Sequence, residues 1–197
     1  DFVANVSHEM RTPLTVVAGF IETLESIPMS EPDRQSMLGM MATQTQRMQA
    51  IVADLLTLAE LEGRLQPPID IWTPCRTLIA RTADTGRGLS LGQHAIEVES
   101  GPPCEIAGAT GELQSALDNL VSNACRYTPN GGRIRLGYVL ESNGAVRFEV
   151  SDTGPGIAAE HLPRLTERFY RVDSGRSREH GGTGLGLSIV KHVMQRH

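Results

Sequence analysis

Ser7-His8-Glu9-Met10-Arg11-Thr12-Pro13-Leu14 stands in the first of two long amphipathic stretches of this chain. His8 lies opposite the centre of the apolar stripe of the predicted helix, and Thr12, one turn later, shares its face. Pro13 removes one helical hydrogen bond, so we expect the helix to bend just after this group. The stripe advances in steps of three and four residues, through Phe2, Val6, Met10, Leu14, Val17, Ile21 and Leu24.

A second helix is predicted after a turn that Pro28, Ser30 and Pro32 mark. Its heptad-like series occupies Leu38, Met41, Thr45, Met48, Val52, Leu55 and Ala59. Two such helices form a hairpin, and a lone hairpin cannot bury both stripes. A dimer with a four-helix bundle would bury them. The alternative is that the hairpin packs on the rest of its own chain.

The remainder of the chain changes from one helical period to a mixed pattern. We predict an α+β fold with an antiparallel or mixed sheet. Strands are expected at 95–98, 133–140 and 145–150, and helices at 74–83, 112–127 and 184–195. The predicted organisation is a helical hairpin (1–62), a linker (63–68) and an α+β domain (69–197).

Composition limits the classes of function. Hydrophobic residues make up 40% and charged residues 21%, as in soluble globular proteins. The net charge of −5 offers no basic field for nucleic acid or an anionic membrane. The three cysteines are far apart without a CxxC, so we expect free thiols in a reducing compartment. No apolar run reaches the roughly 20 residues that span a bilayer. Because the chain begins inside a helical pattern, we expect it to be part of a longer protein.

His8 is a candidate nucleophile because it lies on the polar face of its helix. Imidazole attacks well near neutral pH when one ring nitrogen is unprotonated. The carboxylate of Glu9 can hold the proton on the other nitrogen and stabilise the cation as a bond forms. For this motif alone, a solvated surface histidine is an equal alternative.

Asn119 and Asn123 share one face of a predicted helix. Their amide oxygens suit Mg²⁺ that keeps most of its water and also touches phosphates. Asparagines near a helix end also cap or bond the backbone, which is the alternative for this pair. Arg126 could add a phosphate contact, and Tyr127 a flat surface for a base.

Two glycine-containing segments complete the candidate site. In Asp152-Thr153-Gly154-Pro155-Gly156-Ile157, after a strand, a buried carboxylate could accept a hydrogen bond from an exocyclic amine such as that of adenine. Gly181-Gly182-Thr183-Gly184-Leu185-Gly186-Leu187-Ser188 runs into the last helix, where backbone N–H groups bind anions. The second segment is neither a Walker A loop nor a Rossmann fingerprint.

The order and spacing of these motifs, with Arg168-Phe169-Tyr170-Arg171, resemble the H, N, G1, F and G2 boxes of sensor histidine kinases. The resemblance extends over the whole chain. It implies a dimeric helical hairpin, a four-helix bundle in the dimer, followed by an α/β-sandwich ATP-binding domain of the gyrase/Hsp90-like superfamily. The family's ATPase domain normally continues with two more strands, so the resemblance also implies that these are missing here.

The resemblance implies a role for each candidate residue. His8 is the phosphoacceptor, Glu9 its orienting base, and Asn119 and Asn123 hold the Mg²⁺–triphosphate, Asn123 being the better metal ligand. Arg126 would reach phosphate oxygens and Tyr127 lie against adenine. The remaining expected nucleotide contacts are Asp152, Gly154 and Gly156 at the adenine, Arg171 with the lid 174–180 over the phosphates, and Gly182, Gly184 and Gly186 at the far hinge of the lid.

The implied activity is ATP-dependent autophosphorylation of His8 and phosphotransfer to an aspartate of a response-regulator receiver domain. Thr12 could orient water for dephosphorylation of that partner, or it could bond a backbone carbonyl near Pro13. Three stretches, 2–9, 44–48 and 162–173, look like the phosphate-regulon subgroup of Gram-negative bacteria. The resemblance therefore implies a homodimer and the cytoplasmic portion of a bacterial inner-membrane protein. The alternatives are a non-catalytic scaffold switched by ATP and a gyrase/Hsp90-type ATPase without histidine transfer.

Overall fold

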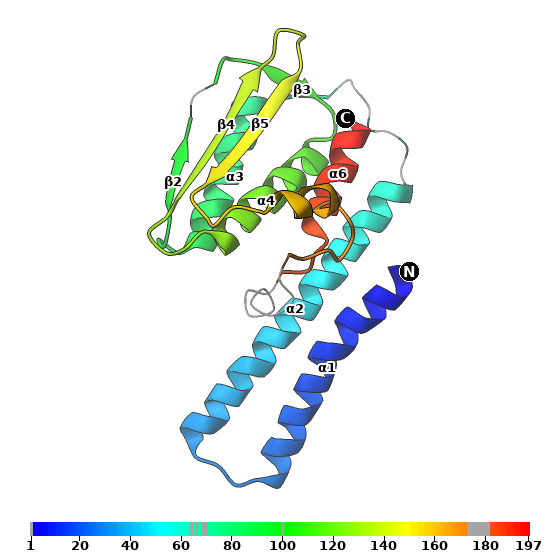
Figure 1. Cartoon of the computed structure of the whole chain (residues 1–197), viewed down its shortest axis with the longest axis vertical. Coiled ribbons are helices and arrows are strands. Elements are labelled where there is room, and N and C mark those ends of the chain that lie inside the picture. The colour runs from blue at the N-terminus through cyan, green and yellow to red at the C-terminus, as the bar shows by residue number, and fades with distance from the viewer. Residues whose placement is uncertain (1, 64, 66, 68–70, 100, 173–181) are drawn as a thin grey trace.

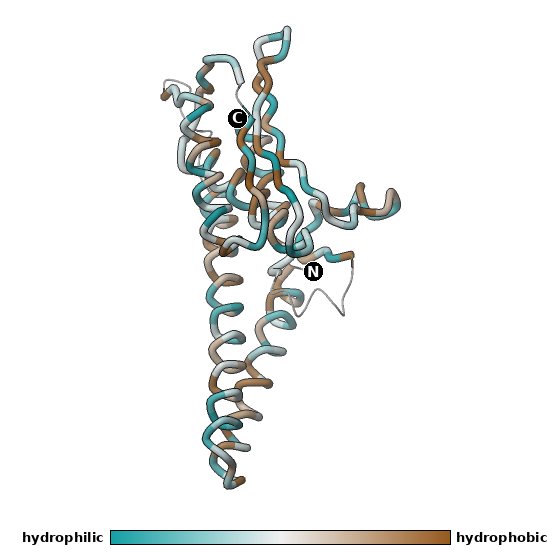
Figure 2. The backbone as a smooth tube through the Cα atoms, turned by 90° about the vertical axis from the view of Figure 1, so that its left-hand side faces the viewer, coloured by the Kyte–Doolittle hydropathy of each residue, from teal (hydrophilic) through white to brown (hydrophobic). Residues whose placement is uncertain are grey.

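The computed structural model describes residues 2–63, 65, 67, 71–99, 101–172 and 182–197. Its elements are, in chain order, α1 (Phe2–Ser26), α2 (Glu31–Gly63), β1 (Trp72–Pro74), α3 (Cys75–Ser90), β2 (Ala95–Val98), β3 (Glu105–Ala107), α4 (Thr110–Tyr127), β4 (Arg133–Leu140), β5 (Val146–Asp152), the 3₁₀ helix η1 (Ala159–Arg164) and α6 (Gly186–Arg196). A long α1–α2 hairpin extends from a mixed domain whose strands β2, β4 and β5 lie over helices α3 and α4 (Figure 1). The side view separates the strand layer from the helices behind it (Figure 2). The predicted hairpin and α+β domain are both present.

The turn of the hairpin lies where the prolines and serine predicted it. Helix α1 continues through the buried Pro13, and α2 begins at Glu31, so Pro32 falls in a first turn where its missing N–H is not needed. Ser30 caps this helix, because its Oγ accepts the N–H of Asp33 at 3.3 Å and contacts the Asp33 carboxylate at 2.6 Å. Glu31 and Asp33 also favour the positive end of the helix dipole.

The apolar stripes of the hairpin are only partly covered by this chain. Leu58 and Leu61, near the end of α2, are buried in the core of the mixed domain. Further along the hairpin, Leu14 is 58% exposed and Val52 is 44% exposed. The end of α2 therefore packs on its own chain, as the alternative expects. Much of both apolar stripes remains exposed to solvent in the single chain.

The larger sheet has the order β2-β4-β5 and is mixed. Strand β2 runs parallel to β4 with Ala95 opposite Arg133, and β5 runs antiparallel to β4 with Ile134 opposite Asp152. Strands β1 and β3 pair antiparallel in a second sheet, with Trp72 opposite Ala107. Neither of these two strands is predicted from the sequence, because three residues are too few to show an alternating pattern.

Helix α3 continues seven residues beyond its predicted end at Ala83, to Ser90. The prediction stopped early because glycines at 86 and 88 disfavour a helix interior. Gly86 serves the packing of α3, since an added Cβ would lie 2.8 Å from Val121 and 3.0 Å from Ile96. The close approach of α3 to α4 therefore requires glycine here.

The core of the mixed domain consists of two clusters of buried side chains that meet along α4. One cluster lies between α2, α3, α4 and α6, with Leu58, Leu61, Leu78, Leu113, Ala116, Leu117, Leu185, Ile189 and Val193. The other lies under the sheet, with Cys75, Ile79, Ala83, Val121, Ala124, Ile134, Leu136 and Tyr138. Helix α4 is thereby held on two sides, which fixes the polar face that carries the two asparagines.

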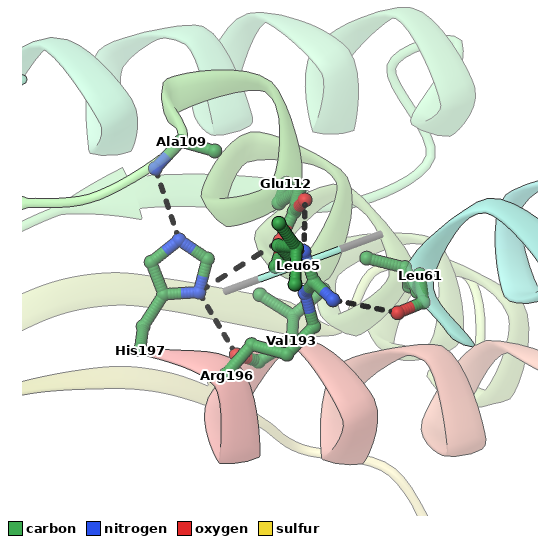
Figure 3. A network of polar contacts seen from close by, with 7 residues as sticks. All are labelled: Leu61, Leu65, Ala109, Glu112, Val193, Arg196 and His197. Atoms are coloured by element: carbon green, nitrogen blue, oxygen red, sulfur yellow. Dashed lines mark hydrogen bonds and ion pairs between the residues drawn. The ribbon is translucent and has the colours of Figure 1, made fainter. Parts of the chain in front are cut away.

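Arg196 joins the end of α2 to the mixed domain (Figure 3). Its guanidinium donates to the carbonyl oxygens of Leu61 at 2.6 Å and Leu65 at 2.7 Å, and pairs with Glu112 at 3.1 Å. A cation is favourable at a helix C-terminus. Among the residues that the structure describes, no helix is long and apolar enough to cross a membrane.

Candidate functional site

His8 stands on the open side of α1 with Glu9 beside it. The His8 side chain is 74% exposed, and its Nδ1 lies 3.8 Å from Oε1 of Glu9. The other oxygen of Glu9 accepts a hydrogen bond from Nη2 of Arg47, on α2, at 2.8 Å. The Arg47 side chain is only 9% exposed. One carboxylate therefore faces both the candidate nucleophile and a buried cation of the neighbouring helix.

Thr12 follows His8 by one turn, as predicted, and is exposed. Its hydroxyl donates to the carbonyl oxygen of His8 at 3.3 Å. This acceptor differs from the one in the structural alternative, because the carbonyl that Pro13 leaves without its helical N–H is that of Glu9. The oxygen of Thr12 keeps its lone pairs for water. The role of Thr12 stays a prediction.

The predicted magnesium and phosphate residues lie together on the last turns of α4. Asn123 Oδ1 accepts a long hydrogen bond from Arg126 at 3.4 Å. Asn119 instead donates from Nδ2 to the carbonyl oxygen of Ser115 at 2.9 Å, which leaves its Oδ1 toward Gly186, where an added Cβ would come within 2.5 Å. Asn119 thus makes the backbone bond that the alternative for this pair anticipates, and Gly186 is needed for its approach. The metal-binding role of the two asparagines stays a prediction.

Asp152 ends β5 and is exposed, so the expectation of a buried carboxylate is wrong. Its Oδ1 accepts the N–H of Gly154 at 2.8 Å, which closes a tight turn. A Cβ on Gly154 would lie 2.7 Å from that oxygen and 3.0 Å from the carbonyl oxygen of Tyr127. Asp152 and Tyr127 are therefore brought together by a glycine turn. Gly156, with φ +73°, has open space around it.

The ends of the segment predicted to cover the phosphates are held together. Arg171 donates from Nη1 to the carbonyl oxygen of Gly182 at 2.7 Å. Gly184 has φ +74°, and a Cβ there would meet the backbone of Phe169 at 2.9 Å. A Cβ on Gly182 would lie 3.4 Å from Arg126. The predicted lid itself, 174–180, lies outside the described residues, as does part of the linker 63–68.

Polar contacts connect the glycine-rich segment to the hairpin. Thr183 donates from Oγ1 to Oδ2 of Asp54 on α2 at 2.6 Å. Arg168 pairs with Glu62, further along the same helix. The ring of Phe2, on α1, lies 6.0 Å from that of Phe169. In this arrangement both helices of the hairpin contact the segments that flank the predicted phosphate site.

Electrostatics also link the two halves. Burial raises the pKa of Asp54, while the hydrogen bond from Thr183 and the charge of Arg126 act against that shift. Burial lowers the pKa of Arg171, with the nearby Arg47 cation adding to the effect. Tyr127 and Glu9 act on Arg171 in the opposite direction. Arg171 is therefore close enough to the Glu9–Arg47 ion pair beside His8 to feel both charges.

Arg47 and Asp54 come to the site without any role assigned from sequence. Each is one polar residue in a long helix, and a helical period says nothing about which residue of another element it will meet. Arg47 stood inside the motif that resembles the phosphate-regulon subgroup, which was the one available signal. Among the residues that the structure describes, no three His, Cys, Asp or Glu side chains form a metal-binding group.

Comparison with known proteins covers both halves of the chain. Residues 1–64 match the His Kinase A (phospho-acceptor) domain. Residues 108–197 match the Histidine kinase-, DNA gyrase B-, and HSP90-like ATPase. The chain is 48% identical over 199 residues to the phosphate regulon sensor protein PhoR of Pseudomonas aeruginosa, covering 100% of this chain and 45% of that protein. It thus spans about half the length of the curated relatives it matches.

Solved structures share the fold. The structure of full-length ShkA in complex with AMPPNP has a TM-score of 0.63 and 29% identity, covering 98% of this chain and 40% of that one. The histidine kinase ThkA in complex with response regulator protein TrrA has a TM-score of 0.72 and 21% identity, covering 86% of this chain and 50% of that one. At 21% identity the second likeness concerns the fold alone.

Proposed function

Because this chain belongs to the sensor histidine kinase family and contains its phospho-acceptor and ATPase domains, we propose that it uses ATP to phosphorylate its own His8. The observation that carries the proposal is the place of Glu9, with one oxygen 3.8 Å from the exposed imidazole of His8 and the other on Arg47. The same pair lies within electrostatic reach of Arg171, beside the predicted phosphate site. The phosphoacceptor helix and the nucleotide-binding half thus meet in one chain.

In the proposed reaction, Nε2 of His8 forms a bond to the γ-phosphorus of ATP as the bond to the bridging oxygen breaks, and ADP leaves. Glu9 accepts a hydrogen bond from Nδ1–H and stabilises the imidazolium that develops. The present 3.8 Å separation must shorten by a small rotation of the imidazole or the carboxylate. Bound Mg²⁺ would neutralise the triphosphate charge, and Asn123 and Asn119 are proposed to hold it.

The nucleotide contacts follow the same proposal. Arg126 and Arg171 both lie beside Gly182, and we assign both to phosphate oxygens. Asp152 accepts the adenine amine while Tyr127, 45% exposed, offers its ring to the base. Since Asp152 is exposed here, its hydrogen bond to adenine would gain strength only when the base excludes water.

Incubation with γ-labelled ATP tests the proposal. Label should enter the chain, survive base and be lost in acid, as expected of phosphohistidine, and His8→Ala should stay unlabelled. A scaffold that only binds ATP would incorporate no label in either chain. An ATPase without histidine transfer would release inorganic phosphate equally from both.

We further propose phosphotransfer from His8 to an aspartate of a response-regulator receiver domain, and dephosphorylation of that partner assisted by Thr12. The relative named phosphate regulon sensor protein favours signalling in phosphate starvation. Labelled, ATP-free chain mixed with a receiver domain should lose its label as the receiver gains it. Label that stays on the chain with every receiver offered would reject this step.

A further inference from the structure

Two of the three cysteines are neighbours at the junction of β1 with α3. Strands β1 and β3 pair antiparallel with Pro74 opposite Glu105, and the next step of that register sets Cys75 opposite Cys104. Although Cys75 is already the first residue of α3, its backbone N–H donates to the carbonyl oxygen of Cys104 at 3.0 Å, so the two residues remain side by side just beyond the strand pair. The cysteines are free thiols, as expected from sequence, but 28 intervening residues fold so that two of them meet.

The backbone geometry suits a bond between the two sulfur atoms. Residues directly opposite in an antiparallel pair point to the same face, with Cα atoms about 4.5–5.5 Å apart. Disulfides usually join Cα atoms about 4.4–6.8 Å apart. Cys75 is fully buried and Cys104 packs against the same cluster, which includes Tyr138. Both side chains therefore face one part of the core.

We propose that Cys75 and Cys104 are a modification site that forms a reversible disulfide with a low-molecular-weight disulfide as oxidant. Cys104 reacts first because it is partly exposed, whereas Cys75 is not. Its thiolate attacks one sulfur of the oxidant, forms a mixed disulfide and releases one small thiolate. The sulfur of Cys75 then attacks that of Cys104 and releases the second. Two electrons pass to the oxidant, and the two protons leave with its thiols.

The surroundings of the pair set the rates. Burial, and secondarily the contact with the Cys104 thiol, raise the pKa of Cys75 to about 12. Since the thiolate is the nucleophile, closure of the bond is slow. A thiol of high pKa is also a poor leaving group, so the finished bond resists cleavage by a monothiol. The site is therefore expected to respond to sustained oxidation rather than to brief pulses.

The third cysteine offers a matched control within the same domain. Cys125 lies on α4 and donates from Sγ to the carbonyl oxygen of Gly86 at 3.6 Å. Burial raises its pKa too, but it has a backbone oxygen rather than a thiol as partner. Cys125 therefore differs from Cys75 in its partner, which is a backbone oxygen rather than a second thiol. The proposal depends on this difference.

Oxidation of the reduced chain with glutathione disulfide, followed by intact-mass measurement and peptide mapping, tests the pair. The unmodified chain and Cys125→Ser should both lose two hydrogens and yield one linked peptide joining Cys75 to Cys104. Cys104→Ser should form no internal link. The oxidised chain should melt at higher temperature, because the link closes the α3–β2 segment into a loop and restricts the unfolded chain.

Three outcomes would overturn the proposal: a stable glutathione adduct on Cys104 without a link, a link that includes Cys125, or no oxidation while the urea-unfolded chain is fully oxidised. Cys75→Ser replaces a fully buried thiol and could fail to fold. The comparison of the unmodified chain with Cys104→Ser decides the question without it. Because no step uses nucleotide, failure here would leave the kinase proposal unaffected, and the reverse also holds.

Discussion

Arg47 on α2 donates from Nη2 to Oε2 of Glu9 on α1 at 2.8 Å, and this ion pair joins the two helices of the hairpin beside His8. Glu9 has a side-chain exposure of 26% against 74% for His8, so its carboxylate is held between the helices while the imidazole is free to turn. If Glu9 orients His8, Arg47 orients Glu9. The ion pair thus suggests a positioning role for a residue that neither reacts nor touches the imidazole.

Arg47→Gln should lower the rate of autophosphorylation by about tenfold, a part of the roughly hundredfold or more that a positioned acid–base group contributes. The reason is that Glu9 would no longer be held toward His8. The KM for ATP should stay unchanged, because Arg47 is not among the proposed nucleotide contacts. Initial rates with labelled ATP at several concentrations measure both quantities.

A double-mutant cycle separates this role from a general loss of structure. If Arg47 acts through Glu9, then Arg47→Gln should have little further effect in a Glu9→Gln chain. Arg47→Lys keeps the charge and should recover part of the rate. If the fold-loss of rate in the double variant equals the product of the two single fold-losses, Arg47 does not act through Glu9.

Thr12→Ala is expected to keep autophosphorylation and to lose most dephosphorylation of the response regulator. Thr12 shares the face of His8 one turn away, and its hydroxyl oxygen is proposed to orient water. If the hydroxyl serves only the carbonyl of His8, both activities should fall in parallel. Measuring the two rates on one preparation of Thr12→Ala, with Thr12→Ser as the hydroxyl-bearing control, distinguishes these roles.

Asp152→Ala and Asn123→Ala should weaken nucleotide binding for different reasons. Loss of the Asp152 carboxylate removes the acceptor for the adenine amine, so ADP and ATP should be affected alike by about 1–3 kcal/mol, with or without Mg²⁺. Loss of the Asn123 amide removes a proposed metal ligand, so its effect should depend on Mg²⁺. Titration calorimetry with and without Mg²⁺ measures this. If both variants lost the same nucleotide affinity with and without Mg²⁺, the separate roles proposed for Asp152 and Asn123 would be wrong.

Val52→Asp should convert a dimer to a monomer. Val52 belongs to the predicted stripe and is 44% exposed in the single chain, so a partner hairpin would bury it. An unpaired charge in that bundle would destabilise the dimer by about 3–5 kcal/mol. Ala50→Asp, an exposed position on the opposite face of α2, is the matched control and should leave the mass unchanged. Sedimentation equilibrium measures both, and a monomeric unmodified chain would refute the bundle.

Asp54 gives a pH dependence whose sign follows from its burial. Burial raises the pKa of Asp54 in the folded chain, so between the ordinary aspartate pKa and that raised value the folded state binds more protons than the unfolded state. The contribution of Asp54 to stability is therefore fully present below the ordinary pKa and is lost as pH rises through the raised one. Asp54→Asn keeps an acceptor for Thr183 but cannot titrate.

Urea unfolding of both chains across the acidic range measures this effect. The difference in unfolding free energy, unmodified chain minus Asp54→Asn, should decrease as pH rises through that window and then level off. Taking the difference cancels the titration of the other carboxylates. A difference that is constant with pH, or that grows as pH rises, would contradict the raised pKa.

Local patterns in the sequence determined most of the elements. The predicted strands at 95–98 and 133–140 agree with β2 and β4, and the helix at 112–127 begins only two residues late. These segments were predictable because alternation and helical period are properties of neighbouring residues. Glycine and proline indicated the turns, because glycine permits backbone conformations that other residues rarely adopt and the proline ring fixes φ.

Only the tertiary structure decided which distant side chains meet. Arg47 reaches Glu9 because the turn after α1 sets how the two helices face each other, and Asp54 reaches Thr183 because Leu58 and Leu61 bury the end of α2 against the mixed domain. Cys75 and Cys104 meet through a strand pair of three residues on each side, too short to leave a pattern. A period in sequence records which face of an element is apolar, but the partner of that face is chosen by packing, which minimises exposed apolar surface over the whole chain at once.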